Sequence, residues 1–392
     1  MLRLPEIHFE KRLKPPRWLG PAMPPIAVLA ALIIGGLILW ASGRDPIDIY
    51  QRMVRVSFTN PGALSATLVA ATPLVLTGLA AAITFRMKVW NIGADGQLMI
   101  GAVFASAAGI ALDEQGLAVS MTVMIIAGMV GGGLWAAIPA LLRVYLNTSE
   151  VLTTLMLNYI APLILFYLIF STTSYWRDLT TEGARVFPRG KTILEGAFWP
   201  EYGGGVVVPF GFILGIVLAV LLTVVVRSTR FGFQMRVSAD SPTAGRYAGI
   251  RTARLLVLVM VLSGAVAGIA GASQIGDFSH RLEPKILQFA VFGYTGIAVA
   301  ALVRYHPLGV VVSAILVGAL SNAGLALQGP ELPLGLIGVN QGLILLLVAA
   351  SEVSARYKVV VGRRPRTGHG AQQAGGDLDG GPAEEPASGG VS

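Results

Sequence analysis

Long apolar runs constrain this chain more than any other feature of its sequence. A helix needs roughly 17 to 25 apolar residues to cross a bilayer, and ten stretches meet or approach that length. They are residues 24–42, 63–85, 94–112, 117–142, 151–170, 206–226, 254–275, 286–303, 308–327 and 334–350. The runs are continuous rather than alternating, which argues against a membrane β-barrel. The pattern predicts an all-α integral membrane protein with about ten transmembrane helices.

The composition agrees with this class. Hydrophobic residues make up 54% of the 392 residues and charged residues only 13%, whereas soluble domains carry about 25% charged residues. The chain has no cysteine and only four scattered histidines, so neither a disulfide framework nor a metal site is predicted. The formal charge of +8 suits cytoplasmic loops of a membrane protein better than a nucleic-acid-binding surface.

The distribution of Lys and Arg predicts the orientation. With the N-terminus in the cytoplasm, the inner segments hold 20 of the 29 basic residues and the outer segments hold 9. This bias follows the positive-inside rule and predicts that both termini are cytoplasmic. Five spans then lie on each side of a long outer loop, which is compatible with a 5+5 inverted repeat.

These spans also suggest a division of the chain. Residues 1–23 form a basic cytoplasmic segment, and residues 24–353 form the transmembrane domain, whose first run we interpret as a retained span. Within that domain, 171–205 is the outer loop and 227–253 is a basic cytoplasmic loop. Residues 354–392 are rich in Gly, Ala and Pro towards their end and are predicted to be a disordered cytoplasmic tail.

The stretch "VWNIGADGQLMIGAV", residues 89–103, places polar groups at the start of the third span. Gly93 and Gly96 allow the backbone to turn or break there. Non-helical backbone at membrane depth must be buried in protein or face water. Asp95 is interpreted as a helix-start cap near the positive end of the helix dipole.

Charged residues are nearly missing from the spans, and amides remain within or beside them. Asn91, Gln97 and Asn158 are candidate contacts for an uncharged polar solute, although such amides also hydrogen-bond one another between helices. Asp95 and Glu150 sit only at predicted span ends, so the spans lack the buried charges that ion-driven carriers use.

No catalytic set or nucleotide-binding motif stands out. The segment "RGKT", residues 189–192, lacks the first glycine of a phosphate-binding loop, because position 185 is Arg. A chain of this kind is therefore expected to transport rather than catalyse, with its energy source in another chain.

The cytoplasmic loop contains "SADSPTAGRYAGI", residues 238–250, which reads as a short helix. Asp240 or Ser241 can serve as its N-cap, with Pro242 at the first helical position and Gly249 closing it. A small apolar surface is expected from Ala244, Tyr247, Ala248 and Ile250, among Arg236, Arg246 and Arg251. Two interpretations stand: a basic loop on the acidic lipid surface, or a docking helix for a cytoplasmic partner.

Four blocks in order carry a resemblance to a known family. They are "VWNIGADGQLMIGAV", "SEVLTTLMLNYIA" (149–161), "RVSADSPTAGRYAGI" (236–250) and "GYTGIAVAALVRYHPLG" (293–309). The chain resembles bacterial ABC-transporter permeases of the ribose, branched-chain amino acid and nucleoside class. It is most similar to the nucleoside type that works with a lipoprotein of the basic-membrane-protein kind. Trp90 and Asp95 stand where that family has Phe and Glu.

The resemblance implies a permease subunit of an ABC importer in the plasma membrane, translocating nucleosides by alternating access. ATP and Mg would be bound by partner ATPase subunits, with no cofactor in this chain. A second related permease, in a heterodimer, and an extracytoplasmic substrate-binding lipoprotein would complete the complex, with the outer loop as a candidate receptor contact. The residues implied in ATPase coupling are Arg236, Asp240, Pro242, Ala244, Arg246, Tyr247, Ala248 and Gly249. The alternatives are a permease for a sugar such as ribose or for branched-chain amino acids, or a stand-alone secondary carrier.

Overall fold

The computed structural model describes residues 7–11, 19–112, 116–171 and 174–328, together with 339, 342–343, 346–347, 350–351 and 357–361. Helices dominate these residues. The α-helices are α1 Leu19–Ala41, α2 Pro46–Val54, α3 Ala63–Arg86, α4 Ala94–Ala111, α5 Leu117–Leu146, α6 Glu150–Phe170, α7 Glu182–Val186, α8 Phe210–Ser228, α9 Arg230–Asp240, α10 Pro242–Tyr247, α11 Thr252–Ser273, α12 Pro284–Ala290, α13 Phe292–Leu302 and α14 Pro307–Ala326. The π-helical turns are η1 Arg55–Thr59 and η3 Gln274–Ser279, and η2 Glu195–Ala197 is a 3₁₀ turn. The strands are β1 Ile7–Lys11, β2 Glu201–Tyr202, β3 Val208–Pro209 and β4 Tyr357–Val361.

Eight helical segments of the described residues are long and apolar enough to cross a membrane, and α1 adds a shorter apolar stretch, Pro25–Ala41. Nine of the ten predicted spans coincide with these helices. The tenth, residues 334–350, falls mostly outside the described residues. The all-α membrane fold is therefore confirmed. The cytoplasmic location of both termini and the inverted repeat stay predictions.

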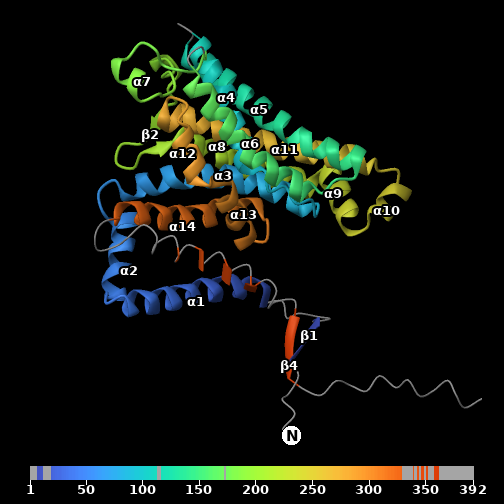
Figure 1. Cartoon of the computed structure of the whole chain (residues 1–392). Coiled ribbons are helices and arrows are strands. Elements are labelled where there is room, and N and C mark those ends of the chain that lie inside the picture. The colour runs from blue at the N-terminus through green and yellow to red at the C-terminus, as the bar shows by residue number, and fades with distance from the viewer. Residues whose placement is uncertain are drawn as a thin grey trace, which may run out of the picture.

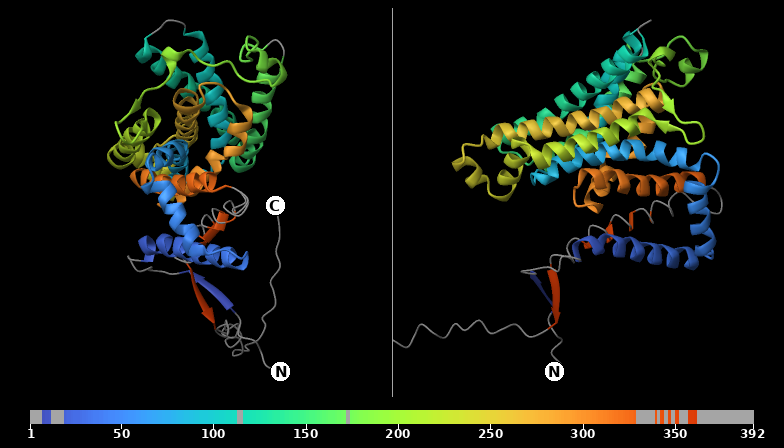
Figure 2. Two further views of the ribbon diagram at one scale, coloured as in Figure 1. Left: turned by 90° about the vertical axis from the view of Figure 1, so that its left-hand side faces the viewer. Right: turned by 180° about the vertical axis from the view of Figure 1, so that it is seen from behind.

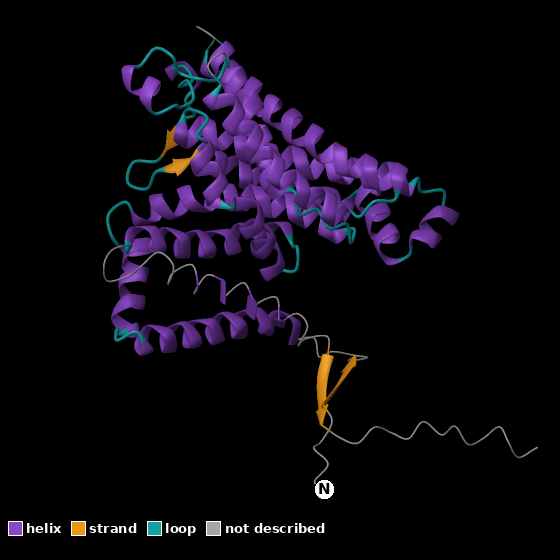
Figure 3. Ribbon diagram, viewed as in Figure 1, coloured by secondary structure: helices purple, strands orange, loops and turns teal. Residues whose placement is uncertain are grey.

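The helices form a bundle around α3, α4 and α11 (Figures 1 and 2). These three are the most deeply buried of the candidate spans, whereas α6 and α8 expose most of their surface. A helix that is hydrophobic all round can be buried on every side, which accounts for the central position of α3. Figure 3 shows how little of the described chain is strand or loop.

Glycines bring α4, α5 and α11 into backbone contact. A Cβ atom on Gly132 would lie 2.2 Å from the carbonyl oxygen of Gly264, and one on Gly268 would lie 2.0 Å from that of Gly128. Small residues at such crossings let membrane helices pack closely. Gly133 differs, because its Cβ would meet nothing nearer than 3.5 Å.

The segment between the first two spans contains a helix, α2, that was not anticipated. Its N-cap Asp45 accepts a hydrogen bond from the Ile47 N–H at 2.9 Å. Tyr50 of α2 donates its hydroxyl proton to the Leu32 carbonyl of α1 at 2.6 Å, so α2 ties α1 to the bundle.

The start of the predicted disordered tail requires a correction. Residues 357–361 form β4, which pairs antiparallel with β1, placing Ile7 opposite Val361. The composition of the segment explains why it is ordered, since Tyr-Lys-Val-Val-Val has high strand propensity. Residues 362–392 lie outside the described part of the chain.

The predicted span 286–303 is broken rather than continuous. Helix α12 ends at Ala290, and α13 begins at Phe292. Val291 between them has φ +43°, a left-handed conformation that is strained for a β-branched residue. The break leaves a second set of helix-start N–H groups inside the bundle.

Candidate functional site

The start of α4 is a true interruption between two spans. Lys88, with φ +58°, ends the turn after α3, and residues 89–92 run without helical structure to the N-cap at Gly93. Gly96 packs so tightly that a Cβ there would lie 2.9 Å from Trp135 Nε1 and 3.0 Å from Asn158 Oδ1. The backbone at this point is therefore enclosed by protein, as membrane depth requires.

Asn91 and Gln97 bind each other. Asn91 Nδ2 donates to Gln97 Oε1 at 3.0 Å, and Gln97 Nε2 donates back to Asn91 Oδ1 at 2.9 Å. Asn91 Nδ2 also donates to Ser263 Oγ at 3.0 Å, and its Oδ1 accepts from the Gly93 N–H at 2.9 Å. Each side chain is only 1% exposed. In this conformation the pair joins the start of α4 to α11 and faces no open space.

Asn158 of α6 connects three segments. Its Oδ1 accepts from the Gly96 N–H at 2.9 Å. Its Nδ2 donates to the Ile92 carbonyl at 2.8 Å and to the Tyr294 hydroxyl at 3.0 Å. Of the three amides singled out from the sequence, it is the one whose contacts reach a partly exposed side chain.

Asp95 was expected to cap the start of α4, but it binds the start of α13 instead. Helix α4 has Gly93 as its N-cap and no side-chain cap. Instead, Asp95 Oδ1 accepts from the Gly293 N–H in the first turn of α13 at 2.6 Å. The interrupted span leaves that N–H without a helical partner. A Cβ on Gly293 would lie 2.2 Å from the Asp95 nitrogen, so only glycine fits this contact.

The cytoplasmic loop forms two helices that extend beyond the bundle, with α10 at its tip (Figure 1). Ser241 is the N-cap of α10: its Oγ accepts from the Ala244 N–H at 3.2 Å, and Pro242 follows it. Gly249 has φ +77°, and the Gly249 and Ile250 N–H groups bond back to the Arg246 and Gly245 carbonyls at 3.0 and 2.9 Å. This pairing is a Schellman motif, which fixes the end of the short helix.

The surface of α10 is open. Tyr247 is 90% exposed, and Ala244, Arg246 and Ala248 are exposed as well. Ile250, which was expected on the same surface, packs against the main core instead. The apolar surface of α10 is therefore smaller than predicted.

Other residues of the loop hold it to the bundle. Arg236 Nη1 donates to the Val226 carbonyl at 2.6 Å. Asp240 lies 3.5 Å from Lys88, an exposed ion pair that contributes little stability. Sequence reasoning gave Arg236 and Asp240 the same role as Arg246, and both residues are exposed. Their contacts help to position the loop, and their part in ATPase coupling stays a prediction.

A basic cluster lies beside this loop and was not singled out from the sequence. Arg86 Nε donates to the Tyr305 carbonyl at 2.8 Å, and Arg227 Nη2 lies 2.6 Å from His306 Nε2. Burial, with the nearby charges of Arg227 and Arg86, holds the pKa of His306 below its ordinary value. The neutral imidazole can accept a hydrogen bond from Arg227, so the cluster links α8 to the start of α14.

The loop predicted to lie outside, residues 171–205, is folded onto one end of the bundle. The Ile193 N–H donates to the His280 carbonyl at 2.7 Å, and the Trp199 N–H donates to the Gly276 carbonyl at 3.0 Å. Within the loop, Asp178 accepts from the Thr180 and Thr181 hydroxyls at 2.8 and 2.7 Å.

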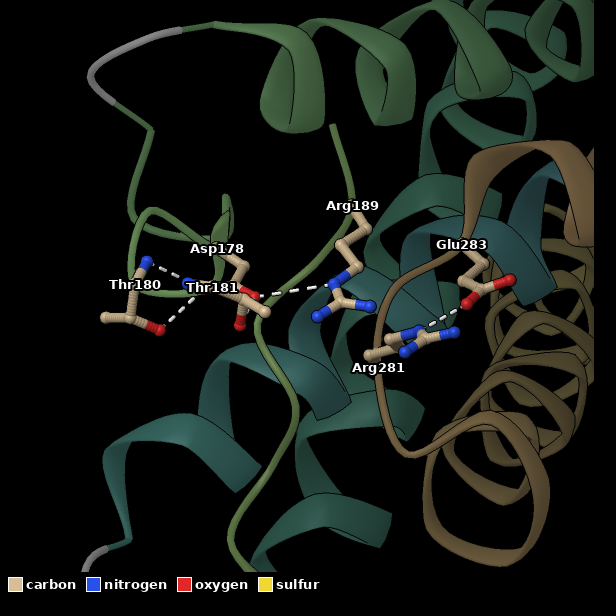
Figure 4. Close-up of polar contacts among 6 residues, drawn as sticks. All are labelled: Asp178, Thr180, Thr181, Arg189, Arg281 and Glu283. Carbon is tan, nitrogen blue, oxygen red and sulfur yellow. Dashed lines mark hydrogen bonds and ion pairs between the residues drawn. The ribbon is translucent and has the colours of Figure 1, made fainter. Parts of the chain in front are cut away.

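Figure 4 shows the contacts of Asp178 with Thr180 and Thr181. It also shows Arg189, whose Nε lies 3.4 Å from Asp178 Oδ2, and the neighbouring Arg281–Glu283 ion pair. Burial acts to raise the pKa of Asp178, but the threonine hydrogen bonds outweigh it and hold the pKa well below its ordinary value. The loop is thus a preformed structure, and its place on the outer face stays a prediction.

Within the residues the structure describes, no group of three or more His, Asp or Glu side chains could hold a metal ion. The polar network at the start of α4 and the exposed helix α10 are therefore the two features that carry functional hypotheses.

Comparison with known proteins gives consistent matches. The family described as "Branched-chain amino acid transport system / permease component" matches residues 63–349. A glucose ABC transporter permease protein of Haloferax volcanii is 29% identical over 365 residues, covering 90% of this chain and 93% of the relative. A nucleoside ABC transporter permease protein of Lactococcus lactis subsp. cremoris is 27% identical, covering 84% and 91%. A guanosine ABC transporter permease protein of Bacillus subtilis is 29% identical, covering 88% and 97%.

Proposed function

Because the chain belongs to the family of permease components of branched-chain amino acid transport systems, we propose that it translocates nucleosides as one half of a heterodimeric channel. At the coarser level, the chain is a permease subunit of an ABC importer and a multi-pass protein of the bacterial plasma membrane. The proposal adds to this a substrate, a set of partners and the residues that act.

The names of its relatives support a nucleoside as substrate. Two of the three relatives are permeases for nucleosides or for guanosine. A neutral solute also suits the uncharged amides Asn91, Gln97 and Asn158 that were singled out as path candidates. The Haloferax volcanii relative is a glucose permease, which makes a sugar the second candidate.

The energy source is proposed to be a separate ATPase that docks on α10. The observation that carries this proposal is the exposed helix with both ends fixed: Ser241 caps its start and Gly249 its end. A rigid, protruding helix can transmit a push from a partner to α9 and α11, which flank it in sequence. ATP and Mg would be bound by that partner, and a second permease and a receptor lipoprotein on the outer face would complete the importer.

Alternating access is the transport mechanism that suits this arrangement. ATP binding can shift the channel between states only if the ATPase binds ATP with different affinity in each state. The two helical halves would then rock about the path between them. The preformed outer loop, held by the Asp178 contacts, is the proposed receptor contact.

We expect Asn91→Ala and Gln97→Ala each to reduce solute transport without preventing assembly. These amides are closed on each other in this conformation, so they reach the solute only if the network opens during the cycle. Losing one amide also leaves its partner's buried polar atoms unsatisfied, which costs roughly 1–3 kcal/mol. Thermal unfolding of the purified complex should therefore be measured beside uptake, so that a loss of transport can be separated from a loss of stability.

Ser263→Ala is the matched control, because Ser263 joins the same network from α11 and donates onward to the Ala80 carbonyl at 2.7 Å. Equal transport by all three variants would mean that the amides only pack the helices.

The substrate is tested most directly on the receptor. Isothermal titration of the cognate lipoprotein with nucleosides, bases and sugars should give tight binding for nucleosides alone. Binding of glucose or ribose without nucleosides would replace the nucleoside proposal with the sugar alternative. Uptake by the purified permease in liposomes that lack any ATPase would instead favour a secondary carrier.

A further inference from the structure

Helix α6 presents one exposed face along its whole length. Its large exposed residues recur mostly every three or four positions, and they are Leu152, Met156, Tyr159, Ile160, Leu163, Tyr167 and Phe170. The opposite face, which includes Asn158 and Ala161, is buried in the bundle. A face of this kind meets lipid, a partner protein or water.

The middle of that face carries a tyrosine hydroxyl, which is unfavourable in contact with lipid tails. Tyr159 lies near the centre of the span Glu150–Phe170 and is 64% exposed. Among the described residues, its hydroxyl has no hydrogen-bond partner. A hydroxyl left without a partner in hydrocarbon costs several kcal/mol, and tyrosines of membrane helices gather at the interfaces rather than at the centre. Tyr167, closer to the outer end, needs no such explanation.

The exposed face of α5 provides the contrast. Its large exposed residues from the start of the helix to residue 141 are aliphatic or Met, and they are Leu117, Val119, Val123, Ile126, Met129, Val130, Leu134, Ile138 and Leu141. That surface suits lipid, so the tyrosine at the centre of α6 marks a different environment.

Tyr294 lies at the same depth and joins the polar network. It is the third residue of α13, directly after the break at Val291, and it is 36% exposed. Its hydroxyl oxygen accepts from Asn158 Nδ2 at 3.0 Å. Within the described part of the chain, its own proton meets no acceptor, so it is free to donate. The network around Asn158 therefore extends to a partly exposed side chain.

We propose that Tyr159 and Tyr294 line the solute path at mid-membrane, where Tyr159 offers a ring for stacking and Tyr294 donates a hydrogen bond. A flat base with acceptor atoms matches both groups, because base–aromatic stacking is worth about 1–3 kcal/mol per base and tolerates every base. The assignment of a base rests on the proposed nucleoside function. The assignment of a water-filled lining does not, because it follows from the tyrosine hydroxyls alone.

The absence of native cysteine makes a direct test feasible. Tyr159→Cys, in the assembled transporter in liposomes, should react with a charged, water-soluble methanethiosulfonate reagent. Leu134→Cys is the matched control: Leu134 is 58% exposed near the middle of α5, and the reagent should modify it at least tenfold more slowly. Guanosine with its receptor should slow modification of Tyr159→Cys several-fold.

Equal, slow modification of the two cysteines would overturn the proposal and place Tyr159 in lipid. Copper-phenanthroline oxidation that joins Tyr159→Cys by a disulfide to a cysteine introduced into the second permease, without modification by the reagent, would overturn it in favour of a permanent subunit contact. Rapid modification that glucose slows and guanosine does not would support the lining and contradict the nucleoside assignment, so the two failures are distinguishable.

A second variant tests the hydrogen bond without creating a cavity. Tyr294→Phe should raise the KM for guanosine uptake several-fold, while the affinity of the separate receptor for guanosine stays unchanged. A wild-type KM would remove Tyr294 from the path, because a merely structural hydroxyl would show its loss in thermal stability instead.

Discussion

Arg246→Glu combined with Ala248→Asp is expected to abolish ATP-driven transport while the chain still inserts and folds. Both side chains are exposed on or directly after α10, and neither makes a side-chain hydrogen bond or ion pair among the described residues. The Schellman contacts that close α10 use backbone atoms only, so the helix itself should survive. The double change places carboxylates on the surface proposed for the ATPase. We expect at least a tenfold loss of ATPase binding, which corresponds to about 1.4 kcal/mol.

The measurement pairs co-purification of the ATPase with uptake in liposomes. Ser228→Asp combined with Arg230→Glu is the matched control, since it makes the same change in charge on exposed residues of the same cytoplasmic loop. That control also tests whether the loss of basic residues disturbs insertion. Normal uptake by the α10 variant, or equal losses in both double variants, would contradict a specific docking role for α10.

The boundaries of α10 illustrate what the sequence could predict. Ser241, Pro242 and Gly249 act through local backbone chemistry: an N-cap, a first helical position and a left-handed end. Such signals can be read without knowing the fold. The position of the spans could be predicted for a similar reason, because a bilayer requires long apolar runs whatever the neighbouring helices do. The signal for α2 was also present, in Asp45 followed by Pro46, and was overlooked.

Features set by distant contacts could not be predicted. The break at Val291 carries no proline or glycine of its own, and it depends on contacts that Asp95 and Thr77 make with the start of α13. Asn91 and Gln97 are six residues apart and bind each other only because the chain turns at Gly93. The sequence therefore allowed us to select Asn91 and Gln97 as candidate site residues, but it did not allow us to predict which groups they would hydrogen-bond. Strand β4 was not predicted from the sequence, because its partner strand β1 lies at the opposite end of the chain.

The largest effect on folding is expected from Gly268, where α4, α5 and α11 meet. Cβ atoms built on Gly101 and Gly132 would lie 2.4 and 2.8 Å from the Gly268 Cα, and a Cβ on Gly268 itself would lie 2.0 Å from the Gly128 carbonyl oxygen. These neighbours are backbone atoms of other helices and cannot rotate away. Gly268→Ala should therefore force α11 away from α5. Overpacking of a well-packed core costs typically about 1–3 kcal/mol, and occasionally more, and we expect the upper end of that range.

Gly133→Ala is the control within the same set of helices. Gly133 is buried in α5, one residue from Gly132, but its Cβ would meet nothing closer than 3.5 Å, which is ordinary contact. Both variants add one methyl group to a buried membrane helix, so they differ only in the space available. Thermal unfolding in detergent and the yield of membrane-inserted chain should fall sharply for Gly268→Ala and stay near wild type for Gly133→Ala. If the two variants unfolded at the same temperature, the close backbone packing of α5 against α11 would not be what holds this bundle together.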